Sequence, residues 1–287
     1  MKRPDSTGWP APAKLNLCLH VVGRRADGYH LLQTAFQFID LADEIDFSDR
    51  PDGLIERVGG PAEIPAEQDL VVRAARLLAR QAGCARGVAI TVRKRIPIQG
   101  GLGGGSSNAA TVLVALNERW GLRLPEDDLA QMGLALGADV PVFVRGRAAW
   151  AEGIGEQLTP VDFPEATYLV IRPDAAVGTA EVFQAAELTR NSPLTTIRGF
   201  LEGGGHNDCT PVVRRRYPQV AEALDWLQDF AEARLTGTGS CVFASFPGEA
   251  AAQRVLARMP GRWQGFVVRG INRSPLLDRL RDEKART

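Results

Sequence analysis

The first third of the chain alternates apolar and polar positions, which predicts two extended segments joined by a turn. In residues 15–22, LNLCLHVV, leucine or valine occupies every second position, as in a half-buried strand. Lys14 and Asn16 fall on the opposite face, so we expect both to project into one cleft while the leucines pack behind them. The dipeptide Asp27-Gly28 predicts a reversal before a second extended run, LLQTAFQFIDL.

Helical spacing begins in residues 69–82, DLVVRAARLLARQA, where Asp69 is placed to cap the start and Gly83 follows the end. The pattern then predicts a strand over residues 87–98, a loop over GGLGGGSS and a helix over residues 108–120. This order of strand, glycine loop and helix can bring the N-terminus of a helix to a bound anion.

The rest of the chain mixes helices with short strands, which predicts an α+β fold with a second domain. The expected helices cover residues 126–136, 181–188, 217–233 and 248–258, and the expected strands cover residues 145–161, 167–173, 241–246 and 265–270. Gly153, Gly155 and Pro160 punctuate the chain, so we predict two domains, residues 1–155 and 156–287.

Composition narrows the class of protein. The 287 residues contain 34 Lys and Arg against 34 Asp and Glu, so the net charge suggests neither nucleic-acid binding nor a membrane surface, and a small-molecule partner is expected. The four cysteines form no CxxC pair, which fits a reducing cytoplasm, and no apolar run is long enough to span a membrane. Residues 1–10 are polar and are expected to be frayed.

The most informative segment is GGLGGGSSNAA, which begins at Gly100 and places five glycines within six positions. Glycines let consecutive backbone N–H groups converge on one anion, and the following helix adds its unpaired N–H groups and positive dipole end. Ser106 and Ser107 could add hydroxyl donors or a magnesium ligand. A P-loop would need a lysine after the glycines, and a Rossmann fingerprint would need glycine at position 106, so neither pattern fits.

The run PIQGGLGGGSSNAA, residues 97–110, resembles the phosphate loop of the GHMP kinase superfamily. PAKLNLCL near the N-terminus and LTGTGSCVF, residues 235–243, are similar to that superfamily's two other motifs. The resemblance implies ATP and Mg²⁺ as cofactors. It also implies a two-domain fold, with an N-terminal domain like ribosomal protein S5 domain 2, a ferredoxin-like C-terminal domain and an active site between them.

Within the superfamily, the long opening run that contains DGYH, together with GADVPVF, resembles kinases that act on a cytidine diphosphate-linked methylerythritol in non-mevalonate isoprenoid biosynthesis. The implied reaction is phosphorylation of the 2-hydroxyl by ATP, giving the 2-phosphate and ADP. Lys14 and Asp139 match the catalytic lysine and aspartate of these kinases. Whether Asp139 removes the hydroxyl proton or orients the alcohol is left open by the sequence.

The resemblance also implies the binding residues. The nucleotide-binding positions are Lys94, Pro97, Ile98, Gln99, Gly100, Gly101, Leu102, Gly103, Gly104, Gly105, Ser106, Ser107 and Asn108. The substrate-binding positions are Asn16, Tyr29, His30, Asp139, Thr179 and Phe183, with Tyr29 and Phe183 stacking on the cytosine and His30 at the base edge. Gly237, Thr238 and Gly239 form a supporting loop that approaches the phosphate loop.

Several of these positions also have a purely structural interpretation. Phe183 fits a helix core, and Lys94 fits a solvated strand edge beside its two arginine neighbours. Asn207 and Asp208 fit either a helix cap or a cleft wall. His20 and His206 are expected to be structural.

Three alternatives stay open at this point. The chain could be a sister kinase for mevalonate, homoserine or a sugar, a superfamily member that senses ATP and ligand without turnover, or a dinucleotide oxidoreductase. The motif DGYH argues against the first, and the presence of both Lys14 and Asp139 argues against the second. A monomer or weak homodimer is expected.

Overall fold

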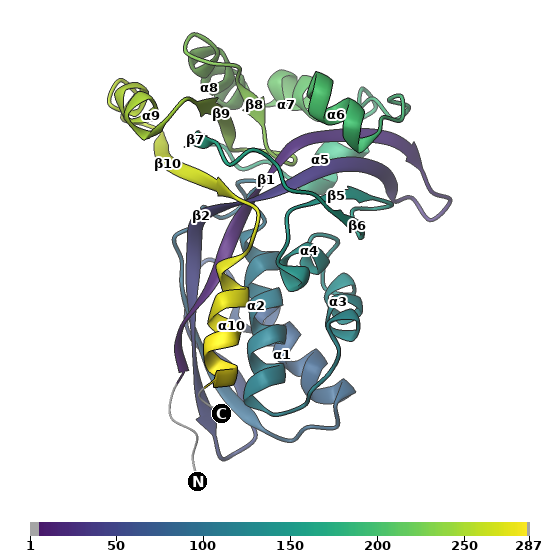
Figure 1. Ribbon diagram of the computed structural model, residues 1–287, viewed down its shortest axis with the longest axis vertical. Coiled ribbons are helices and arrows are strands. Elements are labelled where there is room, and N and C mark those ends of the chain that lie inside the picture. The colour runs from purple at the N-terminus through teal and green to yellow at the C-terminus, as the bar shows by residue number, and fades with distance from the viewer. Residues whose placement is uncertain (1–5, 286–287) are drawn as a thin grey trace.

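The computed structural model describes residues 6–285 and has two halves that share one continuous sheet (Figure 1). The strands are β1 (Ser6–Arg24), β2 (His30–Arg50), β3 (Ile55–Gly59), β4 (Gly87–Arg93), β5 (Ala149–Glu152), β6 (Gln157–Pro160), β7 (Thr167–Arg172), β8 (Arg234–Leu235), β9 (Val242–Phe246) and β10 (Gln264–Ile271). The helices are η1 (Ala66–Gln68), α1 (Leu70–Gln81), α2 (Gly104–Arg119), α3 (Glu126–Leu134), α4 (Val140–Arg145), α5 (Thr179–Gln184), α6 (Ile197–Gly203), α7 (Thr210–Arg216), α8 (Pro218–Gln228), α9 (Glu249–Leu256) and α10 (Pro275–Ala285).

The long hairpin of β1 and β2 connects the two halves. Different sections of β2 pair antiparallel with β1, β4, β5 and β10, and the sheet order is β3-β4-β2-β10-β7-β9-β8. Within the hairpin Lys14 lies opposite Phe38 and Asn16 lies opposite Phe36. In Figure 1 the hairpin runs from the lower half, alongside α10 and α2, to a tip beside α5 and α6 of the upper half. One hairpin therefore carries residues to both parts of the molecule.

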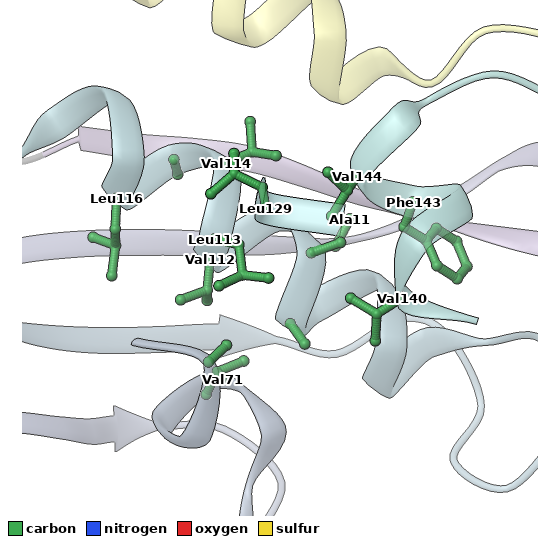
Figure 2. Packing of buried hydrophobic residues seen from close by; sticks show 14 of the residues in the cluster. Ala11, Val71, Val112, Leu113, Val114, Leu116, Leu129, Val140, Phe143 and Val144 are labelled. Atoms are coloured by element: carbon green, nitrogen blue, oxygen red, sulfur yellow. The ribbon is translucent and has the colours of Figure 1, made fainter. Parts of the chain in front are cut away.

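The two largest of the apolar cores lie on either side of the molecule's middle. In the first, α2 is nearly enclosed, and Figure 2 shows its Val112, Leu113 and Leu116 among side chains from α1, α3 and α4. In the second, α7, α8 and α9 cover the strands β7 to β9. Leu19 of β1 belongs to the second core and Leu276 of α10 to the first, so the chain crosses between the cores at both ends. The division of the chain at residue 155 stays a prediction.

The glycine loop continues into α2 earlier than the sequence pattern suggested. We predicted a loop through Ser107, but α2 begins at Gly104, and its N-cap residue Gly103 is left-handed with φ +72° and forms no side-chain cap. Glycine reaches this conformation at little steric cost. The predicted cap of α1 is confirmed, since the backbone N–H of Val71 donates to the carboxylate of Asp69 at 3.1 Å.

The expectation that residues 1–10 are frayed was wrong for the part that the structure describes. Residues 6–10 are the start of β1, and Trp9 is fully buried opposite Ile45. The indole N–H of Trp9 donates to Ser6 Oγ at 2.8 Å, which satisfies its polar atom in the core. The prediction rested on the polar residues of this segment and did not take account of Trp9, a large apolar side chain. Residues 1–5 lie outside the described residues.

Other differences have local causes. The predicted strand over residues 87–98 ends at Arg93, because the Asp43 carboxylate accepts the backbone N–H groups of Arg95 at 2.7 Å and Ile96 at 2.9 Å. The helix expected over residues 181–188 occupies Thr179–Gln184 instead. The sequence analysis expected no strand at β3 or β8 and no helix at α4, α6 or α10, and for α7 it gave only a possible cap at Asn207 and Asp208. No helix within residues 6–285 is both long and apolar enough to cross a membrane.

Candidate active site

A cleft of about 1090 Å³ lies between the two halves and is lined by the β1-β2 hairpin, the glycine loop, the start of α2, α5 and the loop before β9. Of the site residues expected from the sequence, Ser107 and Gly239 do not line it, and every other one does. Ser107 is buried in α2, and no hydrogen-bond partner for its hydroxyl is found in the described part of the chain. The structure thus brings together segments that are far apart in sequence.

Glycine is required at the entrance of α2 for steric reasons. A Cβ atom on Gly103 would lie 2.7 Å from Cζ of Phe143 and 3.1 Å from Cε of Lys14. The first backbone N–H groups of α2 have no partner within the helix, and no side chain caps them. This end of the cleft therefore offers backbone donors and a positive helix end to an anion.

The loop before β9 packs directly on the glycine loop. A Cβ atom on Gly101 would collide with the carbonyl oxygen of Thr236. Across the same contact, the N–H of Cys241 donates to the carbonyl of Gly100 at 3.1 Å, and the N–H of Ser240 donates to that of Gln99 at 3.3 Å. The two halves of the molecule are thus held together by backbone hydrogen bonds at the phosphate loop.

Lys14 is the buried cation of the cleft. Its side chain is 4% exposed, and its ammonium group donates to Asn16 Oδ1 and to the carbonyl of Gly101 at 3.0 Å. It also lies 3.3 Å from Asp139 Oδ2 and 5.3 Å from the ring centroid of Phe36. The three acceptors match the three donors of an ammonium group, so Lys14 has a fixed direction.

The amide of Asn16 is oriented by Thr34, a residue that the sequence analysis missed. Thr34 Oγ1 donates its hydrogen to the carbonyl of Cys18 at 2.5 Å, so it must accept from Asn16 Nδ2, which lies 2.9 Å away. The amide oxygen of Asn16 therefore faces Lys14. The alternation in LLQTAFQFIDL could have placed the side chain of Thr34 on the face of its strand that lines the cleft. The pattern did not distinguish this threonine from an ordinary strand residue.

Asp139 precedes α4 and makes no capping hydrogen bond to that helix. Its side chain is 34% exposed and lines the cleft next to Lys14. A carboxylate beside a fixed cation and beside an anion-binding helix end can contact a hydroxyl group that approaches the anion.

The other end of the cleft carries aromatic side chains. Tyr29 is 59% exposed, and the rings of His30 and Phe183 stack with centroids 5.1 Å apart at 28°. Burial, then the charges of Arg190 and Arg24, lower the pKa of His30 below its ordinary value of 6.5, which favours the neutral ring near neutral pH. Flat, partly exposed rings of this kind suit a planar base.

Thr179, at the start of α5, lies beside the loop that supports the phosphate loop. Its hydroxyl oxygen lies 3.1 Å from that of Thr238. This contact ties the aromatic end of the cleft to the loop of residues 237–239.

Lys94 lies in the cleft rather than on a solvated edge. Its ammonium forms an ion pair with the fully buried carboxylate of Asp43, while Arg93 is exposed and pairs with Glu44 and Asp46. Because Asp43 also holds the backbone that follows Lys94, this pair fixes the approach to the glycine loop.

Asn207 and Asp208 do not line the cleft and instead form hydrogen bonds to backbone groups behind it. The Asn207 amide donates to the carbonyls of Leu235 at 2.9 Å and Gly237 at 2.8 Å, which shapes the supporting loop from behind. Asp208 accepts from the backbone N–H of Val21 at 2.6 Å.

Burial raises the pKa of the Cys18, Cys209 and Cys241 thiols to about 12, so these thiols are poor nucleophiles.

Comparisons with known proteins agree with this arrangement. The family described as GHMP kinases N terminal domain matches residues 69–147, and the family described as GHMP kinases C terminal matches residues 185–265. The 4-diphosphocytidyl-2-C-methyl-D-erythritol kinase of Nitrosococcus oceani is 58% identical over 272 residues, covering 95% of this chain and 97% of that protein. The enzyme of the same name from Alkalilimnicola ehrlichii is 58% identical over 279 residues, covering 97% of this chain and 96% of its own.

The chain belongs to the 4-diphosphocytidyl-2-C-methyl-D-erythritol kinase family of GHMP kinases. A crystal structure of 4-(cytidine 5'-diphospho)-2C-methyl-D-erythritol kinase superposes with a TM-score of 0.78 at 33% identity, covering 93% of this chain and 100% of that one. The resemblance drawn from the sequence and the two-domain GHMP kinase fold are both confirmed. GHMP kinases are ATP-dependent, which agrees with an anion-binding loop at one end of the cleft.

The divalent metal of such a kinase has few candidate protein ligands among residues 6–285. Within residues 6–285 no group of three or more His, Cys, Asp or Glu side chains could hold a metal ion. Mg²⁺ typically takes only one or two protein oxygens and binds mainly through nucleotide phosphates and water. Ser106 and Asp139 supply oxygen atoms beside the glycine loop, so the donor set fits that ion.

Proposed function

We propose that this chain transfers the γ-phosphate of ATP to the 2-hydroxyl of 4-diphosphocytidyl-2-C-methyl-D-erythritol, giving the 2-phosphate and ADP in non-mevalonate isoprenoid biosynthesis. The observation that carries the proposal is the position of Lys14 and Asp139, 3.3 Å apart beside the glycine loop. The aromatic end of the same cleft supports a cytidine substrate, and the related enzymes are named for that substrate.

Phosphoryl transfer depends mainly on positioning and on neutralising charge around the transferred group. The glycine loop and the start of α2 would hold the phosphates, and Lys14, which is fixed by three acceptors, would stabilise the charge that develops. Asp139 would hold the substrate hydroxyl and take or orient its proton. Mg²⁺, held by the phosphates with Ser106 or Asp139, would supply further charge neutralisation.

The substrate side of the cleft would be formed by Asn16, Tyr29, His30, Thr179 and Phe183. Tyr29 and Phe183 offer faces on which the cytosine can stack, and Thr179 joins this wall to the supporting loop of residues 237–239. Lys94, the loop residues 97–106 and Asn108 would form the nucleotide side. The substrate therefore spans from the aromatic wall to the phosphates.

The test is ADP release with Mg·ATP, comparing 4-diphosphocytidyl-2-C-methyl-D-erythritol with mevalonate, homoserine and galactose. We expect turnover with the cytidine compound alone, and a loss of about 100- to 10,000-fold in kcat for Asp139→Asn, the range typical of a general acid-base group. The matched control is Asp127→Asn, because Asp127 is an exposed aspartate of α3 that pairs with Arg145 and lies outside the cleft.

Turnover with another alcohol would support the kinase activity but overturn the proposed substrate. No ADP release with any alcohol would overturn the catalytic proposal and favour a ligand sensor. Full activity in Asp139→Asn would overturn the role given to that carboxylate.

A further inference from the structure

Arg190 lies between α5 and α6, outside the set of residues that line the cleft, yet its guanidinium reaches four acceptors at the aromatic end. Its Nε donates to His30 Nε2 at 3.1 Å. One Nη donates to the carbonyl of Leu188 at 3.0 Å, and the other donates to those of Phe183 at 3.0 Å and Ala185 at 2.7 Å. A single side chain therefore joins the tip of the β1-β2 hairpin to the end of α5.

The contact with His30 determines the state of that ring. A guanidinium Nε always carries hydrogen and can only donate, so His30 Nε2 must be the accepting nitrogen. The ring is then neutral and carries its hydrogen on Nδ1. Nδ1–H is consequently the donor that His30 has to offer a ligand.

The contact with α5 fixes the second aromatic residue. Phe183 and Ala185 present carbonyl groups at the C-terminal end of α5, where cations are favourable and carbonyls lack partners within the helix. The ring of Phe183 in turn stacks on that of His30. Because Arg190 holds the backbone of one ring and a nitrogen of the other, their separation depends on it.

We infer that Arg190 is a positioning residue for base recognition, which fixes His30 as the Nδ1–H tautomer and holds the His30–Phe183 pair in place. The inference rests on the proposed function, since it takes the cytosine as the group that this pair receives. Lysine could not replace Arg190, because an ammonium group lacks the planar set of donors that reaches both the ring and the helix end.

The tautomer is tested without any substrate. Two-bond ¹⁵N–¹H NMR on the full chain labelled in histidine nitrogen, above the pKa of His30, should show the Nδ1–H tautomer, with the signal assigned from a His30→Gln variant. Arg190→Met should move that signal toward the Nε2–H pattern and leave those of His20 and His206 in place. An Nε2–H pattern for His30 in the unaltered protein would overturn the inference.

Kinetic measurements distinguish a positioning role of Arg190 from a contribution to stability alone. Arg190→Met should raise KM for the cytidine substrate about tenfold or more while KM for ATP changes less than about twofold, and Arg190→Lys should fall closer to the Met variant than to the unaltered protein. Arg198→Met is the control, because Arg198 is 86% exposed and pairs only with Glu202 among the ion pairs of the described residues.

An unchanged KM for the cytidine substrate in both Arg190 variants would overturn the inference. If the unaltered protein fails to turn over the cytidine compound, the proposed function fails, while the NMR result still decides the tautomer. The two failures are therefore distinguishable.

Discussion

The two ends of the cleft are built in different ways. The phosphate end is made largely of backbone: the glycine loop, the start of α2 and the loop before β9, locked together by main-chain hydrogen bonds around Lys14. The aromatic end is made of side chains from two halves of the molecule, Tyr29 and His30 on the hairpin and Phe183 on α5, joined through Arg190.

This difference has a functional consequence. Backbone donors around a helix start cannot be moved without moving the helix, so damage at the phosphate end should act on the chemical step. Side chains at the aromatic end are partly exposed, so damage there should weaken substrate binding and leave chemistry nearly intact. Kinetics can therefore separate the two ends.

The largest effect is expected from Gly103→Ala. The added Cβ would meet Phe143 at 2.7 Å and Lys14 Cε at 3.1 Å, and φ +72° is a conformation that alanine rarely adopts. Displacing Lys14 and the first turn of α2 should lower kcat by at least about 100-fold, as a misplacement of about 1 Å can do. Steady-state ADP release measures this change.

Gly121→Ala is the matched control for backbone strain. Gly121 has φ +68°, but apart from its chain neighbours no heavy atom lies within 4 Å of an added Cβ, and it does not line the cleft. It should lose about 1–2 kcal/mol of unfolding free energy and keep its kcat. A loss of kcat equal to that of Gly103→Ala would mean that strain, and not displacement of the site, explains both.

The phosphate end could largely be predicted from sequence, for a physical reason. Glycines, two serines and a run of helix formers lie within one contiguous segment, so the local pattern contains the structure. Even there, the start of α2 was placed too late, because glycine has low helix propensity and the pattern gave no reason to begin a helix at Gly104.

The aromatic end could be predicted only in part. Tyr29, His30 and Phe183 came from a family resemblance, whereas Arg190 carries no motif, and its role depends on tertiary contacts between segments distant in sequence. Trp9 shows the same limit in the core, since its burial depends on pairing with β2 and not on its polar neighbours. Local patterns predict local geometry, and long-range packing decides the rest.

A smaller effect is expected from Phe183→Leu. Stacking of one base on an aromatic ring contributes about 1–3 kcal/mol, so KM for the cytidine substrate should rise about tenfold while kcat changes less than about threefold. Phe230→Leu is the control, because Phe230 packs on the second core and on Trp226 and does not line the cleft. A fall in kcat with unchanged KM would remove the distinction between the two ends.

The smallest effect is expected when the pH is lowered, and it concerns the free energy of unfolding. The three histidines lie in β1, at the start of β2 and in the loop before α7, and His20 is buried against His206, with Asp208 beside them. Burial, then the neighbouring His206, lower the pKa of His20 from 6.5, and Asp208 opposes them in part. Since the unfolded chain takes up a proton near pH 6.5 and the folded chain resists it, the free energy of unfolding should fall as pH drops below 6.5 and level off below the lowered pKa.

Thermal unfolding followed from about pH 7.5 to about pH 5.5 measures this dependence. His20→Gln keeps an acceptor for the backbone N–H of His206, which donates to His20 Nε2 at 3.3 Å, but cannot be protonated, so its stability should change less over that range. His30, whose pKa is also lowered, should account for part of the slope that remains. Parallel slopes of stability against pH for the unaltered protein and His20→Gln would place the acid-sensitive group elsewhere. If acidification lowered kcat and raised KM by equal factors, the two ends of the cleft would respond together.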